Sequence, residues 1–355
     1  MSARRVLITG ANGYIAAQTV ARFLSAGWTV RGTVRDLSSS STRALAAHFA
    51  AEQSKGLFEL IAVPDIRVPG AFNSAVRDVN AIAHLATPVV FDSSDVEYIM
   101  GTAVDGTVGM LDSALKAEKE NENSRLESFV LMSSVVAIRS RAVPPPVTFT
   151  EKDWNDAVVA QVKESGDKAF GHMIYQASKV ESEHAFWNWV KEKKPKFKAT
   201  ALHPSWVAGP PAYLPSSPEG IADTNKFIYT LLSGGEYPEG PGPGYGTHVD
   251  VRDVARMVEW AASHPEVTGG QRYLVGGNGN NGVPQAAADI LREAYPDRRD
   301  FIKAGTPGAG YLPGWAPDPN GSNVDSTKAI EATGQNWISY DKIILDTAKM
   351  FEAFL

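Results

Sequence analysis

The chain has 355 residues, of which 43% are hydrophobic and 21% charged, and its net charge is −6. This composition is ordinary for a soluble globular enzyme and excludes a mainly disordered chain. The negative net charge does not suggest electrostatic binding to nucleic acid or anionic lipid. The chain has no cysteine, which excludes disulfides, zinc–thiolate sites and cysteine nucleophiles, and the spacing of its seven histidines predicts no metal site.

The first two hundred residues alternate short apolar runs with longer helical stretches. The short runs are typical of strands buried on both faces and predict strands at residues 6–9, 28–34, 57–63, 81–85, 128–132 and 198–203. The helical stretches between them include residues 13–26, 96–117 and 172–193. This alternation predicts an α/β fold, in which a Rossmann-type doubly wound parallel sheet is covered by helices on both faces.

The character of the chain changes after Pro204. Glycine and proline crowd residues 209–218, 234–246 and 305–321, between helices expected at 221–232 and 251–262. We interpret this part as a smaller, mostly helical substrate lobe. The expected domains are a cofactor-binding Rossmann domain (1–203), a substrate lobe (204–248 and 277–330) and a C-terminal helix (331–355). Residues 249–276 are expected to return to the Rossmann domain, where 272–275 add one more strand.

A glycine-rich segment, residues 10–16, follows the first strand directly and opens a helix. Gly10 permits a tight turn, Gly13 lets the backbone approach a pyrophosphate, and Ala16 keeps the helix close to the sheet. The helix N-terminus then faces the phosphates. The triplet alone would fit a plain strand-to-helix turn, but the order of strand, triplet and helix predicts a dinucleotide site.

The end of the second strand predicts which dinucleotide binds. A site that prefers NAD has an acidic residue about 20 residues on, which holds the ribose 2′-hydroxyl. This chain has Val34 there, followed by Arg35, whose guanidinium can bind a 2′-phosphate. Arg31 is a second candidate inside the strand, and the alternative is that Arg35 only balances Asp36. We favour NADPH/NADP+ as the cofactor.

Two further segments hold candidate catalytic groups. Tyr175 and Lys179 are four residues apart near the start of a helix, which puts them on one face. A neighbouring ammonium is expected to lower the pKa of the phenol from about 10. Ser133 and Ser134 end a strand at the sheet edge where ligands bind, so a hydroxyl there can contact a substrate carbonyl. Chance helical spacing and strand-ending serines are the alternatives.

These segments together resemble the extended short-chain dehydrogenases/reductases. Within that superfamily the chain is similar to the dihydroflavonol-reductase-like branch, particularly fungal aldehyde and ketone reductases of the methylglyoxal-reductase type. The resemblance covers nearly the whole chain and is firmest before residue 210 or so. The residues that carry it are Gly10-x-x-Gly13-x-x-Ala16, Ser134, Tyr175-x-x-x-Lys179, Val63-Pro64-Asp65-Ile66, His84-Leu85-Ala86-Thr87-Pro88 and His203-Pro204-Ser205-Trp206-Val207-Ala208-Gly209-Pro210.

The resemblance implies a role for each matching residue. Ser134 and Tyr175 would be catalytic, with Tyr175 as the acid that protonates the carbonyl oxygen. Lys179 would complete the catalytic set and also hold the nicotinamide ribose. Arg35 matches the residue that reads the 2′-phosphate. The other implied cofactor contacts are Gly10, Asn12, Gly13, Tyr14, Ile15, Asp65, Ile66, Ala86, Thr87, Pro204 and Val207.

Two positions depart from the wider superfamily. Many members have an asparagine that serves a proton relay where this chain has Ala103, so no relay is expected here. Nucleotide-sugar epimerases usually have arginine and asparagine where this chain has His203 and Trp206. The second departure argues against the epimerase branch.

The sequence therefore predicts an NADPH-dependent oxidoreductase, a carbonyl reductase that reduces aldehydes, ketones or ketoesters to alcohols by hydride transfer. A nucleotide-sugar epimerase or dehydratase and a non-catalytic NADP-binding sensor stay open as alternatives. The candidate walls of the substrate pocket, which fit plain core as well, are Val89, Phe91, Val136, Tyr213, Phe227, Tyr311 and Trp315.

The expected surroundings of the protein follow from the same features. No arginine or lysine cluster near these walls stands out as an anchor for a phosphate or coenzyme A tail, which favours small uncharged substrates. The chain enters its first strand near Met1 without room for a signal peptide, and it has no apolar run of about 18 residues. We expect a cytoplasmic monomer or homodimer with no nucleic-acid, membrane or metal partner.

Overall fold

The computed structural model describes residues 4–87, 95–121, 124–236 and 244–355. The chain divides into two compact units. Unit 1 consists of residues 1–142, 151–203 and 255–273, and unit 2 of residues 143–150, 204–254 and 274–355. The units are groups of residues in mutual contact, and the assignment of a cofactor domain and a substrate lobe remains a prediction.

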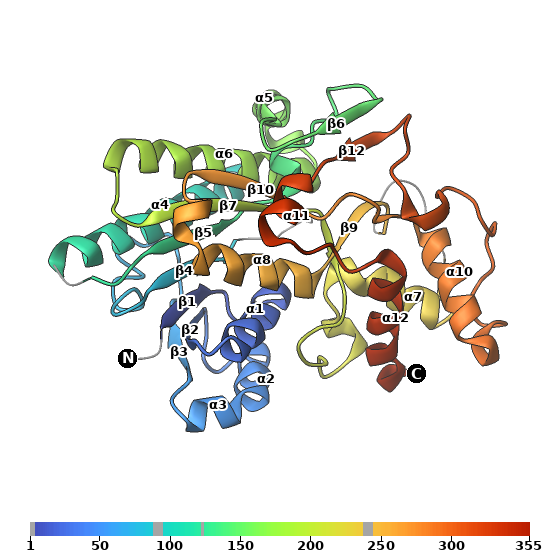
Figure 1. Ribbon diagram of the computed structural model, residues 1–355, viewed down its shortest axis with the longest axis horizontal. Coiled ribbons are helices and arrows are strands. Elements are labelled where there is room, and N and C mark those ends of the chain that lie inside the picture. Colours follow the sequence, from blue (N-terminus) through green and yellow to red (C-terminus); the bar gives the residue numbers. More distant parts are fainter. Residues whose placement is uncertain (1–3, 88–94, 122–123, 237–243) are drawn as a thin grey trace. The chain divides into compact units, whose positions relative to one another are not determined.

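Unit 1 is built on a seven-stranded sheet with the strand order β10-β7-β5-β4-β1-β2-β3 (Figure 1). Parallel pairing joins β1 to β2 and β4, β2 to β3, and β5 to β4 and β7. The strands are β1 (Arg5–Thr9), β2 (Thr29–Val34), β3 (Phe58–Ala62), β4 (Ala81–His84), β5 (Ser128–Met132), β7 (Lys198–Pro204) and β10 (Gln271–Val275). The predicted fold class is confirmed, and so is the return of residues 272–275 as a strand.

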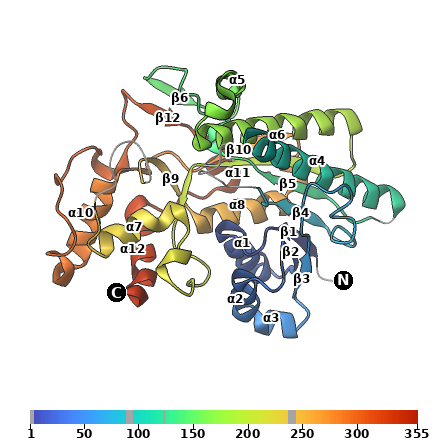
Figure 2. The same ribbon diagram turned by 180° about the vertical axis from the view of Figure 1, so that it is seen from behind.

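Helices cover both faces of this sheet. Figures 1 and 2 show α4 and α6 side by side on one face and α1 and α8 on the other. An ion pair of 2.9 Å between Arg22 and Glu259 joins α1 to α8. The helices are α1 (Tyr14–Ser25), α2 (Ser40–His48), α3 (Ala50–Ser54), α4 (Val96–Glu120), α5 (Asp156–Ser165), α6 (Gly171–Lys193), α8 (Val251–Ser263) and α9 (Pro265–Thr268), with 3₁₀ turns at Val135–Ala137 and Gly166–Lys168.

The core between the sheet and the α4–α6 layer centres on β5, whose five residues are all buried. Phe129 of β5 packs against Phe186 of α6 with ring centroids 5.7 Å apart, and Met110 of α4 belongs to the same cluster. An apolar strand buried on both faces needs such a cover, which explains why residues 128–132 could be read as a strand. The order of the strands reverses between β1 and β4, and open sheets bind ligands at such a point.

Unit 2 has a core of its own, in which Tyr340 is fully buried. The helices that build it are α7 (Lys226–Leu232), α10 (Pro284–Ala294) and α12 (Tyr340–Phe351). Its remaining elements are a three-stranded sheet of β11 (Asn281–Gly282), β9 (Gly246–Asp250) and β8 (Trp206–Ala208), a two-stranded sheet of β12 (Ser322–Val324) and β6 (Val147–Phe149), and α11 (Thr327–Thr333). Within the described residues, no helix combines the length and hydropathy needed to cross a membrane.

The prediction of a helix at residues 221–232 is wrong for the first half of that range. The chain makes 3₁₀ turns at Pro218–Gly220 and Asp223–Asn225, and α7 begins only at Lys226. The buried Asn225 side chain donates to the carbonyl of Gly209 at 2.9 Å and accepts from its N–H at 3.1 Å. This anchoring explains the late start, because asparagine side chains that bond to backbone compete with helix formation.

Candidate functional site

The turn after β1 forms a close-packed cradle at the ends of β1 and β4. Gly10 has φ +65°, and a Cβ there would lie 3.3 Å from Cα and Cβ of Ala86, so only glycine fits without strain. The N–H of Gly13 donates to the Gly10 carbonyl at 2.9 Å. Helix α1 then starts at Tyr14 with no side-chain cap and no acid in its first turn. No carboxylate therefore competes with an anion at this helix end.

The Thr9 hydroxyl, which the sequence reasoning missed, holds the ends of β1 and β4 together. It accepts the N–H groups of Leu85 and Ala86, both at 2.9 Å, and lies 3.1 Å from Nδ1 of His84. Burial lowers the pKa of His84 to about 3, so the ring is neutral and Nδ1 can accept the Thr9 proton. Thr87 directly follows the two residues whose N–H groups bind Thr9. Asn12 ties the glycine turn to α2 by donating to Ser41 Oγ at 2.9 Å.

Arg35 lies exposed at the end of β2 and makes no hydrogen bond or ion pair with any other described residue. Asp36 does not pair with it, because the Asp36 carboxylate accepts from the N–H and the hydroxyl of Ser38, both at 2.8 Å. Arg31, the second candidate, is buried and ion-paired with Glu59 at 2.7 Å. Arg31 is therefore part of the scaffold, and Arg35 presents a guanidinium that no carboxylate of the described residues binds by an ion pair.

Asp65 and Ile66 follow β3 closely and have different partners. The Arg67 guanidinium donates to Asp65 at 2.7 Å and lowers the pKa of that carboxyl to about 2, with a smaller effect from Arg35. Ile66 packs against α4, where a Cβ on Gly106 would lie 2.6 Å from Ile66 Cδ1. Both residues therefore stay beside the exposed end of β2 and β3.

The two serines that follow β5 turn to different partners. Ser133 Oγ donates to Oε2 of Glu183 at 2.6 Å. Ser134 begins the 3₁₀ turn, and its hydroxyl is hydrogen-bonded to the side chain of Tyr175. Ser133 is therefore occupied within the scaffold, and Ser134 is the serine that meets the tyrosine.

Tyr175 is half-buried and Lys179 is buried, one turn apart on α6. Burial raises the pKa of Tyr175, and the hydrogen bond with Ser134 acts in the opposite direction. The lowering by the Lys179 ammonium that the sequence suggested is not found. Lys179 Nζ donates to the Met132 carbonyl at 3.0 Å, and burial lowers the pKa of Lys179 itself to about 8.

One turn beyond Lys179, α6 buries the carboxylate of Glu183, a residue that the sequence reasoning missed. Burial alone would raise the pKa of Glu183, but the charges and hydrogen bonds of His203 and Arg272 hold it well below its ordinary value. An acid four residues after Lys179, on the same helix face, was the available signal. Its oxygens accept from four side chains: Ser133 Oγ (2.6 Å), His203 Nε2 (2.7 Å), Arg272 Nε (2.7 Å) and Trp187 Nε1 (3.1 Å).

The remaining predicted residues belong partly to unit 1, partly to unit 2 and partly to segments outside the described residues. Val136 is half-buried in the 3₁₀ turn of unit 1. Phe227 is 2% exposed and packs in the core of unit 2, so its place in a pocket wall remains a prediction. In the described part of the chain, no group of histidines and acids is arranged to hold a metal. The other predicted residues of unit 2 are Pro204, Val207, Tyr213, Tyr311 and Trp315, and those outside the described residues are Val89 and Phe91.

Comparisons with known proteins bear on the family, the fold and the cofactor. Residues 6–276 match the family described as the NAD dependent epimerase/dehydratase family. The NADPH-dependent methylglyoxal reductase GRE2 of Saccharomyces cerevisiae is 29% identical and covers 98% of each chain. The ketoreductase azaE of Aspergillus niger is 29% identical over 84% of this chain and 85% of its own. The solved structure of yeast methylglyoxal/isovaleraldehyde reductase Gre2 complexed with NADPH matches with a TM-score of 0.81 and 28% identity, over 99% of this chain and 100% of that one.

Glu183 and the four side chains that donate to it form what we call the Glu183 cluster. The cluster predicts that replacing Glu183 by glutamine, which has nearly the same shape, strongly lowers the stability of the protein. Glu183→Gln removes the buried charge that His203 and Arg272 face, so we expect the free energy of unfolding to fall by about 3–5 kcal/mol. Urea denaturation followed by circular dichroism measures this. Glu192→Gln is the matched control, because Glu192 is exposed and its pair with Lys193 should contribute less than about 1 kcal/mol. Equal unfolding free energies for both variants would contradict the prediction.

Proposed function

Because the chain belongs to the NAD-dependent epimerase/dehydratase family, we propose that it reduces aldehydes, ketones or ketoesters to alcohols with Tyr175 as general acid. The observation that carries the proposal is the hydrogen-bonded pair of Ser134 and Tyr175, with Lys179 one turn further along α6. The chain is an oxidoreductase that depends on NADPH, in line with relatives described as methylglyoxal reductase and ketoreductase.

The residues of unit 1 fit an NADP dinucleotide. At Gly10 a Cβ would sit in tight contact with Ala86 on a backbone of positive φ, and the first turn of α1 has no acid that would repel a pyrophosphate. Arg35 offers an exposed guanidinium that makes no ion pair within the described residues, which suits a 2′-phosphate better than a 2′-hydroxyl. When bound, NADPH supplies the hydride that adds to the carbonyl carbon.

The side chains of the site supply the proton and stabilise the charge. Ser134 and Tyr175 both donate hydrogen bonds to the carbonyl oxygen, where negative charge develops. The raised pKa of Tyr175 keeps its phenol protonated at neutral pH, so it can give its proton to that oxygen. The hydrogen bond with Ser134 then favours the phenolate that is left behind, and the Lys179 ammonium would hold the nicotinamide ribose.

The two alternatives have less support. A non-catalytic NADP sensor has no use for Ser134 and Tyr175 in hydrogen-bonding contact beside a buried lysine. A nucleotide-sugar epimerase would keep its NAD bound and would not release NADP+ after each turnover. Absorbance of NADPH during addition of methylglyoxal, other aldehydes, ketones and ketoesters tests all three. Substrate-dependent NADPH oxidation supports the reductase, and none across the panel would contradict it.

Tyr175→Phe removes only the hydroxyl that gives the proton. We expect kcat/KM for methylglyoxal reduction to fall by about 10²–10⁴-fold, the usual contribution of general acid catalysis. NADPH affinity, measured by fluorescence titration, should stay nearly unchanged because the phenol ring remains. Tyr229→Phe in α7 is the control, since it makes the same change in unit 2. Retained turnover in Tyr175→Phe would contradict the assignment of Tyr175 as the general acid.

Arg35→Gln tests the choice of cofactor. Loss of a charge-assisted contact to the 2′-phosphate is expected to lower kcat/KM for NADPH by about 10–100-fold, which corresponds to roughly 1.4–2.8 kcal/mol. Kinetics with NADH should change little, because NADH has no such phosphate. Lys55→Gln, an equal loss of charge at the exposed end of α3, serves as the control. A parallel fall with both cofactors would show that Arg35 does not read the phosphate.

The charge of Lys179 predicts the alkaline limb of the pH profile. Its pKa of about 8 means that the ammonium is lost as the pH rises through that value, so kcat/KM should decline there. The negative charge of Glu183 raises the pKa of Lys179. Glu183→Gln should therefore move the limb to lower pH, while Glu192→Gln leaves it in place. A flat wild-type profile, or a limb that Glu183→Gln leaves unmoved, would rule out Lys179 as its source.

A further inference from the structure

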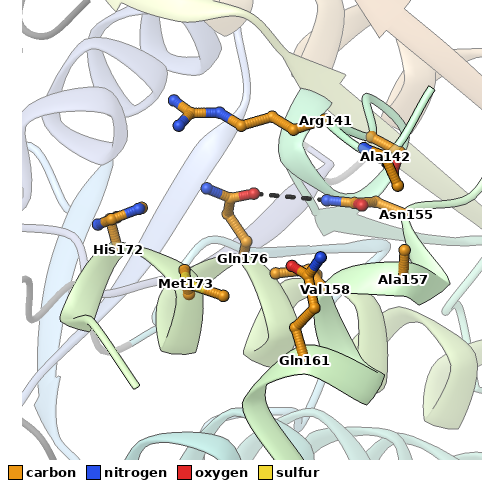
Figure 3. A pocket seen from close by; sticks show the side chains of 10 residues that line it. Arg141, Ala142, Asn155, Ala157, Val158, Gln161, His172, Met173 and Gln176 are labelled. Atoms are coloured by element: carbon orange, nitrogen blue, oxygen red, sulfur yellow. Dashed lines mark hydrogen bonds between the residues drawn. The ribbon is translucent and has the colours of Figure 1, made fainter. Parts of the chain in front are cut away.

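A pocket of unit 1, to which α6 contributes residues on either side of Tyr175 in the sequence, is lined by hydrogen-bonding side chains but by no acid. It lies between the segment that follows the 3₁₀ turn, α5 and the first turns of α6, and its volume is about 80 Å³. That is several times the space needed for one water molecule, so a carboxylate-sized group fits. Figure 3 shows the side chains of Arg141, His172 and Gln176 converging there. The polar residues that line the pocket are Ser140, Arg141, Asn155, Gln161, His172 and Gln176.

The charges around this pocket are of one sign. Arg141 makes no hydrogen bond or ion pair with another residue of the described chain. After burial, the Arg141 charge is the next cause that lowers the pKa of both Arg139 and His172. The Arg141 charge thus disfavours positive charge on Arg139 and on His172, and no acid lines the pocket to offset this repulsion. A bound anion would relieve the repulsion through charge-assisted hydrogen bonds.

The amide of Gln176 is oriented towards the same space. Asn155 Nδ2 donates to the Val136 carbonyl at 3.0 Å and to Oε1 of Gln176 at 3.4 Å, the contact drawn in Figure 3. With its oxygen occupied, Gln176 turns its nitrogen towards His172 and Arg141 (Figure 3). An arginine fork, an imidazole and an amide N–H form a donor set that matches the two oxygens of a carboxylate.

Two of these donors, His172 and Gln176, are close in sequence to Tyr175, the proposed general acid. His172 lies three residues before Tyr175 on α6, and Gln176 follows it directly. Residues three apart on a helix have their Cβ atoms about 5–6 Å apart. These two donors therefore belong to the same turns of α6 as Tyr175, and a substrate with its carbonyl at Tyr175 would reach them with a carboxylate on a short chain.

We propose that Arg141, His172 and Gln176 form a carboxylate subsite, and that the preferred substrates are keto acids and aldehyde acids. The proposal rests on the proposed reductase function and narrows its substrate class. It departs from the expectation of uncharged substrates, since Arg141 and His172 come together only in the fold.

The test compares matched pairs of substrates that differ only in charge. NADPH oxidation is followed with 4-carboxybenzaldehyde and its methyl ester, and with levulinate and methyl levulinate. In the wild type we expect the acid of at least one pair to have the higher kcat/KM. Arg141→Met keeps the apolar stem and removes the charge, so it should lower the ratio of acid to ester by at least about tenfold, or 1.4 kcal/mol. Arg299→Met, at an exposed arginine of unit 2, should leave the ratio unchanged.

The outcomes separate the subsite from the reductase function. Turnover of the esters with no preference for either acid, or an unchanged ratio in Arg141→Met, would overturn the subsite alone. No turnover of any aldehyde or ketone would overturn the reductase itself. Dihydroxyacetone phosphate is tested as a further substrate. A higher kcat/KM for it than for both acids would mean that the pocket binds a phosphate, which would overturn the carboxylate proposal. Because Arg141 is exposed, Arg141→Met should fold, which circular dichroism checks.

Discussion

The buried carboxylate of Glu183 is the constraint on which the catalytic geometry depends. A charge in the interior is tolerated only when donors surround it, and those donors come from Ser133 after β5, His203 on β7 and Arg272 on β10. All must be in place at once, which fixes the rotation and height of α6 over these strands. Tyr175 and Lys179 lie on the same helix, so the position of the proposed acid follows from a carboxylate that never touches substrate.

The same constraint separates the two adjacent serines. The backbone at Ser134 is extended, and successive side chains of extended backbone point in opposite directions. Since Ser133 is directed to Glu183, Ser134 is directed away from it and meets Tyr175. A replacement at Glu183 would therefore act on catalysis through the direction of Ser134 and through the charge of Lys179, two effects that a purely structural role in the core would not combine.

The fold of unit 1 could be predicted from the sequence because its signals are local. β5 is a short run buried on both faces, and the glycine turn needs Gly10 for its positive φ. The Glu183 cluster could not be predicted, because its members come from residues 133, 183, 203 and 272, and only the tertiary structure joins them. The small sheets of unit 2 were missed since β11 has two residues and β12 three, too few to show a period. The raised pKa of Tyr175 comes from burial, which spacing on a helix does not reveal.

The charge states of the side chains along α6 suit the proposed reduction of a carbonyl group. Glu183 is anionic, Lys179 is cationic one turn earlier, Tyr175 is neutral, and Arg141 and His172 lie beside the first turn of the helix. An oxygen that becomes negative at Tyr175 lies beside the Ser134 hydroxyl, which favours the phenolate, while Glu183 is shielded by its own donors. The N-terminal end of α6 adds a partial positive charge. The phenol can therefore stay protonated before the reaction, as its raised pKa requires, and still be stabilised as phenolate afterwards.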